Sequence, residues 1–254
     1  MKFTKMHGIG NDYLFVFGEV PENAADLAVK YSDRQSGIGS DGMIYINYSN
    51  EADFSMRIFN ADGSEAMMCG NGIRCVARFV RERGYTDKDE LTVETLSGIK
   101  RLRIEGELVT VDMGKAIISD DVMLDLGFEC TPVSVGNPHA VIFTDDAALV
   151  LLRDIGPKIE CNKAFAGRVN AEFVSTVGED ELRMRVWERG SGETLACGTG
   201  ACASAAAAVS KGLCRTGEPI KVHLDGGNLE ITVKDDLTCL MRGPAEFVSE
   251  GEIE

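Results

Sequence analysis

The chain has 254 residues, 44% of them apolar, and a formal net charge of −15. This length allows one large domain or two ordinary ones, and the acidic balance argues against nucleic acid or an anionic membrane as a partner. No apolar run approaches the roughly 20 residues that cross a bilayer, and the first residues lack the apolar core of a signal peptide. We therefore expect a cytoplasmic protein that acts on a small molecule.

In the first half of the chain, strand patterns surround one conspicuous helix. Apolar spacing predicts strands over residues 3–7, 13–17, 43–48 and 55–59, and a helix over 22–31. The segment 32–42 is too rich in glycine and polar residues to form a regular element. Three further strands are expected at 91–95, 99–105 and 108–113, and a tight turn at Gly106 and Glu107 joins the last two as a hairpin.

The motif CGNG at residues 69–72 lies at the centre of this half. Apolar residues follow it at helical spacing from Ile73 to Val80. Cys69 should therefore lie at a helix N-terminus, where unpaired N–H groups and the helix dipole favour an anion. Such a position can lower the pKa of a thiol, and its N–H groups can hold a carboxylate.

The second half repeats this order of elements. A second motif, CGTG at 197–200, follows the first at an offset of 128 residues, and a helix is expected over 200–211. Strands are expected at 139–143, 172–177, 220–224, 229–234 and 237–241, with a short helix at 146–152. We predict an α+β fold of two pseudo-symmetric halves in which strands dominate. One half comprises residues 1–115 plus 244–254, whose tail crosses back, and the other comprises residues 116–243.

Two thiols at equivalent helix starts suggest a two-base reaction at one carbon. A thiolate would remove a proton from one face while the opposite thiol donates a proton to the other face, which inverts the stereocentre. The backbone N–H groups after each cysteine could stabilise the charge that develops on a substrate carboxylate. The alternative for each motif is simple packing and turn chemistry, but the matched second copy favours catalysis by Cys69 and Cys197.

Other polar residues have a structural and a functional interpretation. His139 could relay a proton or be structural, and Glu188 with Arg189 could bind an amino acid or be a solvated pair. The asparagines at 11, 60, 137 and 170 occur where turns often place this residue. Only three histidines accompany the eight cysteines, so no metal site is expected. The six cysteines outside the two motifs fit the pattern of small core residues: Cys75, Cys130, Cys161, Cys202, Cys214 and Cys239.

Six segments closely resemble diaminopimelate epimerases, and they occur in the order found in that family. They are KMHGIGNDYLFV, SDRQSGIGSDG, FNADGSEAMMCGNGIRCVARF, VGNPHAV, RVNAEFV and WERGSGETLACGTGACASA. The resemblance implies two halves, each a barrel-like, mostly antiparallel sheet around a central helix. It also implies an isomerase, independent of pyridoxal phosphate and needing no cofactor, that interconverts LL- and meso-2,6-diaminopimelate in lysine and peptidoglycan precursor biosynthesis.

The resemblance assigns roles to matching positions. Cys69 and Cys197 would be the catalytic acid and base, assisted by His139 and Glu188. The remaining matches are substrate-binding positions: Asn11, Asn60, Gly70, Asn71, Asn137, Asn170, Glu188, Arg189, Gly198 and Thr199. Asn60, Asn170 and Arg189 would read the distal end of the substrate, and the family usually forms homodimers. Gly42 stands where some members carry a substrate-contacting glutamine, so no contact is assigned to it.

Two other functions stay open at this point. A proline racemase or hydroxyproline epimerase would share the fold and the two thiols, although its first motif usually has histidine where this chain has Asn71. Phenazine-biosynthesis isomerases lack the cysteine pair. A non-catalytic amino-acid binding protein or redox sensor would use the glycines to hold a ligand and the cysteines to respond to oxidation.

Overall fold

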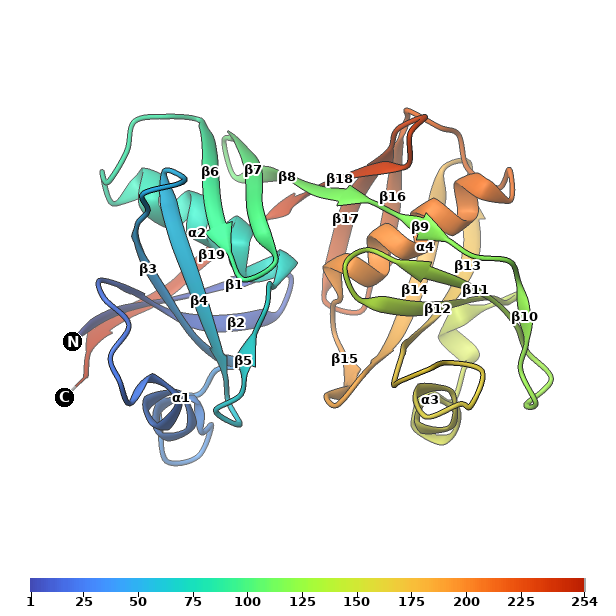
Figure 1. Cartoon of the computed structure of the whole chain (residues 1–254), viewed down its shortest axis with the longest axis horizontal. Helices are drawn as coiled ribbons and strands as arrows, with labels where there is room; N and C mark the ends of the chain where they lie inside the picture. The colour runs from blue at the N-terminus through green and yellow to red at the C-terminus, as the bar shows by residue number, and fades with distance from the viewer. Residues whose placement is uncertain (254) are drawn as a thin grey trace. The chain divides into compact units, whose positions relative to one another are not determined.

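A computed structural model describes residues 1–253 and divides the chain into two compact units. The first unit contains residues 1–111 and 243–254, and the second contains residues 112–242. Each unit has its own sheet and its own central helix, α2 in the first and α4 in the second (Figure 1). The predicted α+β class with two halves of the same element order is confirmed.

The sheet of the first unit curves around helix α2. Its strands pair in the order β19–β1–β2–β3–β4–β6–β7–β8, antiparallel except for the β2–β3 and β4–β6 pairs. Helix α2 contacts β1, β2 and β7, and so touches strands from both ends of this order. The elements are β1 (Lys2–Gly8), β2 (Asn11–Phe17), α1 (Ala24–Ser32), β3 (Gly42–Tyr48), β4 (Phe54–Asn60), β5 (Glu65–Ala66), α2 (Gly70–Glu82), β6 (Glu90–Thr95), β7 (Gly98–Glu105), β8 (Leu108–Lys115) and β19 (Glu246–Glu252).

The second unit repeats this plan around helix α4. Its strands pair in the order β9–β11–β12–β13–β14–β16–β17–β18, with parallel pairs at β12–β13 and β14–β16. Helix α4 contacts strands along this order, from β11 to β17. The elements are β9 (Ile117–Ile118), β10 (Val122–Met123), β11 (Glu129–Ser134), β12 (Pro138–Phe143), the 3-10 helix η1 (Ala147–Leu149), α3 (Leu152–Glu160), β13 (Asn170–Gly178), β14 (Glu181–Glu188), β15 (Gly192–Thr194), α4 (Gly198–Ser210), β16 (Pro219–Leu224), β17 (Gly227–Val233) and β18 (Thr238–Pro244).

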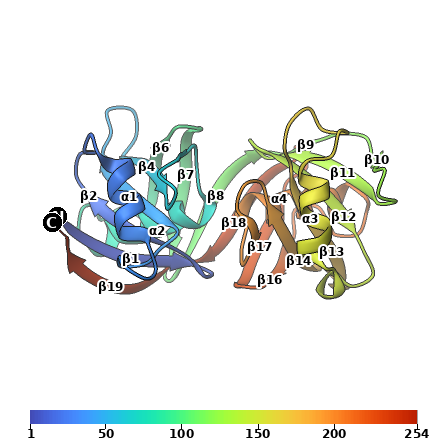
Figure 2. The same cartoon turned by 90° about the horizontal axis from the view of Figure 1, so that it is seen from below.

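The C-terminal tail belongs to the first unit. Strand β19, the last in the chain, pairs antiparallel with β1, the first. The two strands lie side by side in Figure 2. A Cβ atom at Gly251 would lie 2.6 Å from the Phe3 ring, so glycine permits the close approach of the two strands. Ile253 is buried in the same apolar cluster as Phe3. The tail therefore supplies both an edge strand and a core side chain.

Buried apolar faces hold both central helices against their sheets. Ile73, Val76 and Val80 of α2 are fully buried, and burying each such side chain stabilises the fold by about 1.5–3 kcal/mol. Helix α4 buries alanines along most of its length, including Ala201 and Ala205. Because alanine has a short side chain and the highest helix propensity, it suits a helix enclosed by strands.

Two predictions in the second unit are wrong in detail. The short helix expected at 146–152 is a 3-10 turn, Ala147–Leu149, followed by helix α3 at Leu152–Glu160. Gly156 and Pro157 lie inside α3 although both disfavour helices locally. A Cβ atom at Gly156 would lie 2.5 Å from the Trp187 ring, so tertiary packing selects glycine. Cys161, expected in the core, is exposed at the end of α3.

Among residues 1–253, no helix is long and apolar enough to cross a membrane.

Replacing Gly156 by alanine tests the packing of α3 on Trp187. Helix propensity alone would favour alanine by about 1 kcal/mol. The clash with the indole should outweigh this gain, and we expect a loss of about 1–3 kcal/mol in the free energy of unfolding, measured by urea denaturation. Gly167→Ala is the matched control, because a Cβ atom there meets no atom within 4 Å. Equal stability of the two variants would contradict the packing argument.

Candidate active site

Cys69 and Cys197 occupy the same structural position in the two units. Each is the N-cap of its helix, with φ −134° and ψ 119° at Cys69 and φ −129° and ψ 110° at Cys197. The sulfur of Cys69 accepts a hydrogen bond from the Gly72 N–H at 3.4 Å, and that of Cys197 accepts one from the Gly200 N–H at 3.3 Å. The predicted placement of both thiols at helix starts is confirmed.

The glycine three residues after each cysteine lets the helix start pack closely on its sheet. A Cβ atom at Gly72 would lie 2.6 Å from Cδ1 of Ile44, and one at Gly200 would lie 2.8 Å from Oε1 of Glu172. Neither position has room for a larger side chain without displacing its neighbour. The second glycine of each motif therefore allows the start of the helix, with its N–H groups and the cysteine sulfur, to lie close to the sheet.

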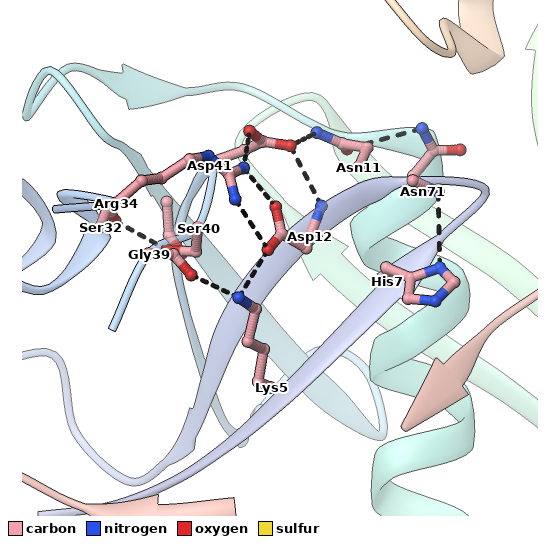
Figure 3. Close-up of polar contacts among 12 residues, drawn as sticks. Lys5, His7, Asn11, Asp12, Ser32, Arg34, Gly39, Ser40, Asp41 and Asn71 are labelled. Carbon is pink, nitrogen blue, oxygen red and sulfur yellow. Dashed lines mark hydrogen bonds and ion pairs between the residues drawn. The ribbon is translucent and has the colours of Figure 1, made fainter. Parts of the chain in front are cut away.

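In the first unit, Asn11 connects strand β2 to Cys69. Its Nδ2 donates to Oδ2 of Asp41 at 2.6 Å, and this bond fixes the orientation of the amide (Figure 3). Its Oδ1 accepts from the Cys69 thiol at 3.4 Å and from Nδ2 of Asn71 at 3.5 Å. Three of the residues proposed from the sequence thus meet around one oxygen atom.

A charged network lies behind Asn11. The Arg34 guanidinium binds Asp12 at 2.7 Å and Asp41 at 2.8 Å, and Lys5 binds Asp12 at 2.9 Å (Figure 3). The hydrogen bonds from Arg34 and Lys5 outweigh the effect of burial and lower the pKa of Asp12. Asp41 also accepts from the Asp12 N–H at 3.1 Å, so the segment before β3 is tied to the start of β2.

A buried arginine supports the start of α2. Arg74 is fully buried and donates to Oδ1 of Asn71 at 2.9 Å, to the Gly70 carbonyl at 3.0 Å and to the Pro244 carbonyl at 3.1 Å. These bonds hold the Asn71 side chain and also anchor the returning tail. The second unit has Cys202 at the equivalent position, 128 residues later.

In the second unit, His139 joins strand β12 to strand β13. Its Nδ1 lies 2.7 Å from Oε1 of Glu172, and its Nε2 lies 3.0 Å from Oδ1 of Asn137. Asn137 in turn donates to the Thr199 hydroxyl at 3.3 Å, and Thr199 lies 3.5 Å from the Cys197 sulfur. His139 and Glu172 are fully buried, so the imidazole is held rigidly between a carboxylate and an amide.

Burial and two carboxylates control Cys197. Burial raises the pKa of the Cys197 thiol well above its usual value, and the charges of Glu188 and Glu172 raise it further, against the hydrogen bonds from Thr199 and Gly200. Burial also raises the pKa of Glu188, although hydrogen bonds from Thr194 and Cys197 oppose this effect. A helix N-terminus by itself would lower the pKa of the thiol. At Cys197 burial and the two carboxylates outweigh this effect, so the thiol keeps its proton near neutral pH.

The turn after β14 is positioned by buried acceptors. Oδ1 of Asn170 accepts from the Arg189 N–H at 2.8 Å. Glu160 accepts from Nε1 of Trp187 at 2.7 Å and from the Gly190 N–H at 3.0 Å. Hydrogen bonds to Asn170 and Glu160 thus hold the backbone at Arg189 and Gly190.

Asn60 lies apart from the hydrogen bonds that join Asn11, Asn71 and Cys69. It ends strand β4, pairs in register with Gly42 and donates from its side chain to the Ser64 hydroxyl at 3.0 Å. Within the described part of the chain, no group of three His, Cys, Asp or Glu residues is arranged to hold a metal ion.

Sequence reasoning overlooked several groups that contact the proposed residues. Asp41 and Arg34 lie in the glycine-rich segment, and Glu160 lies in the helix that was not expected. Of these residues, Glu172 could have been found from the sequence, because it is a charged residue in an otherwise apolar strand pattern.

Solved structures share the fold of this chain. The chain is 19% identical to a phenazine biosynthesis protein of the PhzF family from Bacillus anthracis, with a TM-score of 0.78. The match covers 100% of this chain and 99% of that one. It is 16% identical to a probable proline racemase from Agrobacterium radiobacter, with a TM-score of 0.72 and coverage of 100% and 92%. At these identities the likeness shows the fold alone.

Sequence relatives identify the family. The diaminopimelate epimerase family model matches residues 3–119 and 131–248. The chain is 51% identical to the diaminopimelate epimerase of Bacteroides thetaiotaomicron over 100% of this chain and 98% of that protein. It is 45% identical to the enzyme of Methanococcus maripaludis over the full length of both. The chain belongs to the diaminopimelate epimerase family, as the sequence motifs predicted.

Neutralising Glu172 tests its electrostatic effect on Cys197. In a Cys69→Ser background, Glu172→Gln removes a charge that raises the pKa of Cys197, so the alkylation of Cys197 by iodoacetamide should begin at lower pH. We expect a downward shift of about half a unit or more in the midpoint, followed by mass spectrometry of the Cys197 peptide.

The matched control for this variant is Glu179→Gln, which alters a glutamate whose side chain is 79% exposed. This control should leave the midpoint of Cys197 alkylation in place. An unchanged midpoint in Glu172→Gln would show that the buried carboxylate does not govern the thiol.

Proposed function

We propose that this protein interconverts LL- and meso-2,6-diaminopimelate by a two-base reaction of Cys69 and Cys197. The observation that carries the proposal is the matched pair of N-cap cysteines, which share backbone geometry and an N–H contact to sulfur, in a chain of this family. Burial and nearby carboxylates keep a proton on Cys197, which suits the acid of such a pair.

In the proposed reaction, one cysteine thiolate removes the α-proton of the substrate. The opposite thiol then donates its own proton to the other face of the same carbon, so the configuration inverts and the charge moves from one sulfur to the other. The reverse reaction exchanges the two roles. The two protonation states need comparable free energies, and this requirement explains why both bases are the same kind of residue.

The substrate carboxylate at the reacting centre is proposed to bind at the two helix starts. The N–H groups of Gly70, Asn71, Gly198 and Thr199 lie in the first turns of α2 and α4, where the helix dipole favours negative charge. As the α-proton leaves, charge develops toward this carboxylate, and N–H groups fixed by the fold stabilise it without reorganising. Asn11 and Asn137, each linked to the motif cysteine or threonine, would orient the reacting end.

Discrimination between substrates is proposed to depend on the distal amino-carboxylate end. Arg189 can bind a carboxylate in bidentate fashion, and Asn60 and Asn170 would complete the recognition of this end. Proline lacks a second charged end. Diaminopimelate has a second amino-carboxylate end for Asn60, Asn170 and Arg189 to bind, so it suits these residues better than proline does. The likeness to a proline racemase concerns the fold alone.

The cellular setting is part of the same proposal. We propose that the enzyme acts in the cytoplasm, because all eight cysteines are thiols and such a composition fits a reducing compartment. It would work as a homodimer and serve lysine and peptidoglycan precursor biosynthesis, without pyridoxal phosphate.

Proton exchange in D2O tests this proposal directly. Reduced protein with LL-diaminopimelate and no added cofactor should yield meso product carrying an α-deuterium, followed by NMR. Cys69→Ala and Cys197→Ala should each lower the rate of inversion by at least about 1,000-fold, because each removes one of the two proton-transfer groups.

The exposed thiol provides the control, since Cys161→Ala should retain full activity. Exchange without inversion in one of the two alanine variants would also show which thiol attacks the LL isomer. A wild-type protein that binds the substrate and leaves its α-proton in place would overturn catalysis on this substrate, and would favour the sensor interpretation.

Replacing Arg189 by methionine tests recognition of the distal end. The loss of a charge-assisted bidentate contact should lower kcat/KM for LL-diaminopimelate by about 10- to 150-fold, mostly through KM. Arg103→Met is a suitable control because its side chain is 64% exposed and pairs with Glu105, away from this turn. If the two variants had the same kinetics, Arg189 would not contact the substrate.

A further inference from the structure

Glu160, the last residue of helix α3, accepts hydrogen bonds from two groups at the end of strand β14. Its Oε2 accepts from Nε1 of Trp187 at 2.7 Å, and its Oε1 accepts from the Gly190 N–H at 3.0 Å. Glu160 is buried, with 7% of its surface exposed. Glu188 and Arg189, which the proposed function uses, lie between these two contacts in the chain. One carboxylate therefore holds both ends of the segment 187–190.

The backbone of Glu160 is fixed as well as its side chain. Its carbonyl accepts from the Val169 N–H at 3.1 Å, directly before Asn170 begins strand β13. Gly156 lies one turn earlier in α3 and packs against the indole, because a Cβ atom there would lie 2.5 Å from the Trp187 ring. The carboxylate and the indole are thus both held in place by the packing of α3 on β14.

The Gly190 N–H belongs to the central peptide of a four-residue turn. The Ser191 N–H donates to the Glu188 carbonyl at 3.2 Å, which leaves Arg189 and Gly190 as the two central residues. Gly190 has a φ of +82°, and a positive φ at this position defines a type II turn. The central peptide of a type II turn is flipped relative to that of a type I turn, and glycine can adopt either. The hydrogen bond to Glu160 therefore selects one orientation of the Arg189–Gly190 peptide.

The backbone of Arg189 is fixed although the residue itself is exposed. Its own N–H donates to Oδ1 of Asn170 at 2.8 Å, and the peptide on its other side is fixed by Glu160. An arginine can bind a carboxylate through two parallel hydrogen bonds, but only from a suitable direction. A backbone that is ordered before the ligand arrives lowers the entropy lost on binding.

We propose that Glu160 is a positioning residue for the substrate site, which fixes the turn that carries Arg189 and so strengthens binding of the distal carboxylate. The inference rests on the proposed function of Arg189. Both groups that Glu160 holds are N–H donors, so each needs an accepting oxygen. A carboxylate offers two such oxygens, whereas the amide of glutamine offers one oxygen and one NH2 group. Glutamine at position 160 can therefore accept from Trp187 or from Gly190, but not from both through separate oxygens.

The first unit has a different pair of residues at the equivalent positions. At the offset of 128 residues, α1 corresponds to α3, and Ser32 and Phe59 correspond to Glu160 and Trp187. A phenylalanine ring has no N–H group, so it needs no acceptor from the helix. Ala61 stands where the second unit has its proposed substrate-binding arginine. The carboxylate and the indole thus occur together in the unit whose turn has a proposed role in binding.

The kinetic test is Glu160→Gln, alone and combined with Arg189→Met. The single variant should raise KM for LL-diaminopimelate about tenfold and leave kcat within about twofold, because it affects binding of the distal end rather than proton transfer. In Arg189→Met protein the same change should raise KM less than about twofold, because no guanidinium is left to position. An unchanged KM in the single variant, a loss confined to kcat, or a full tenfold rise in the Arg189→Met background would each overturn the proposal.

A second measurement needs no substrate. Trp187 is the only tryptophan in the chain, so its indole N–H gives a single resonance in 15N-labelled protein. Hydrogen exchange of this group and of the Gly190 amide is followed by NMR. In Glu160→Gln at least one of the two should exchange about tenfold faster or more, whereas the control Glu179→Gln, whose side chain is 79% exposed, should leave both rates and KM unchanged. Wild-type rates at both groups in Glu160→Gln would overturn the proposal.

The wild-type protein provides a test that does not depend on the folding of a variant. Its Trp187 indole and Gly190 N–H groups should exchange at least about tenfold more slowly than in the unfolded chain, and exchange of either at the unfolded rate would overturn the proposal. Slow exchange in a protein inactive toward diaminopimelate would contradict the proposed function and leave the hold of Glu160 on the turn intact. An active Glu160→Gln enzyme with wild-type KM would overturn this inference alone.

Discussion

The start of a helix leaves backbone N–H groups without partners, and both candidate sites are built on this constraint. Most helices meet it with an oxygen from Ser, Thr, Asp or Asn at the N-cap. Here a sulfur occupies that position in both α2 and α4, so the atom that satisfies the helix is also the proposed base. The Gly72 and Gly200 N–H groups donate to these sulfurs, and the proposed carboxylate site uses the other N–H groups of the same first turns. The glycine at the third helical position holds this arrangement against the sheet.

The two units share this backbone arrangement, but different side chains pack around the start of each helix. Ile44 lies under the start of α2, whereas Glu172 lies under the start of α4. Buried Arg74 in α2 corresponds to buried Cys202 in α4. Equivalent sulfurs therefore have unlike electrostatic surroundings, and in the proposed two-base reaction this difference would decide which sulfur holds the proton before the substrate binds. The difference in proton affinity between the two sulfurs must stay small in the proposed reaction, because the reverse direction starts with the proton on the other sulfur.

The sequence was informative wherever a local rule determined the structure. Helical spacing after each CG motif located the N-caps, and the repeat at 128 residues located the second copy of the whole plan. Helix α3 was not foreseen because local propensity at Gly156 and Pro157 opposes a helix, and only the packing of Trp187 against it supplies the reason. Glu172 was overlooked for a related reason. It lies in a strand whose pattern shows burial, and a pattern of burial does not show which polar atom a buried side chain meets.

The glycine-rich segment 32–42 shows how much of the site lies outside regular elements. Its composition indicates a loop, yet Asp41 fixes the amide of Asn11 and Arg34 fixes Asp41. If this orientation were reversed, the Asn11 nitrogen would face the Cys69 thiol, and the contact that accepts the S–H proton would be lost. Because Oδ1 of Asn11 accepts from the Cys69 thiol, the loop determines the hydrogen bond available to the protonated form of Cys69. A segment without secondary structure thus determines the chemistry of a residue at the start of a helix.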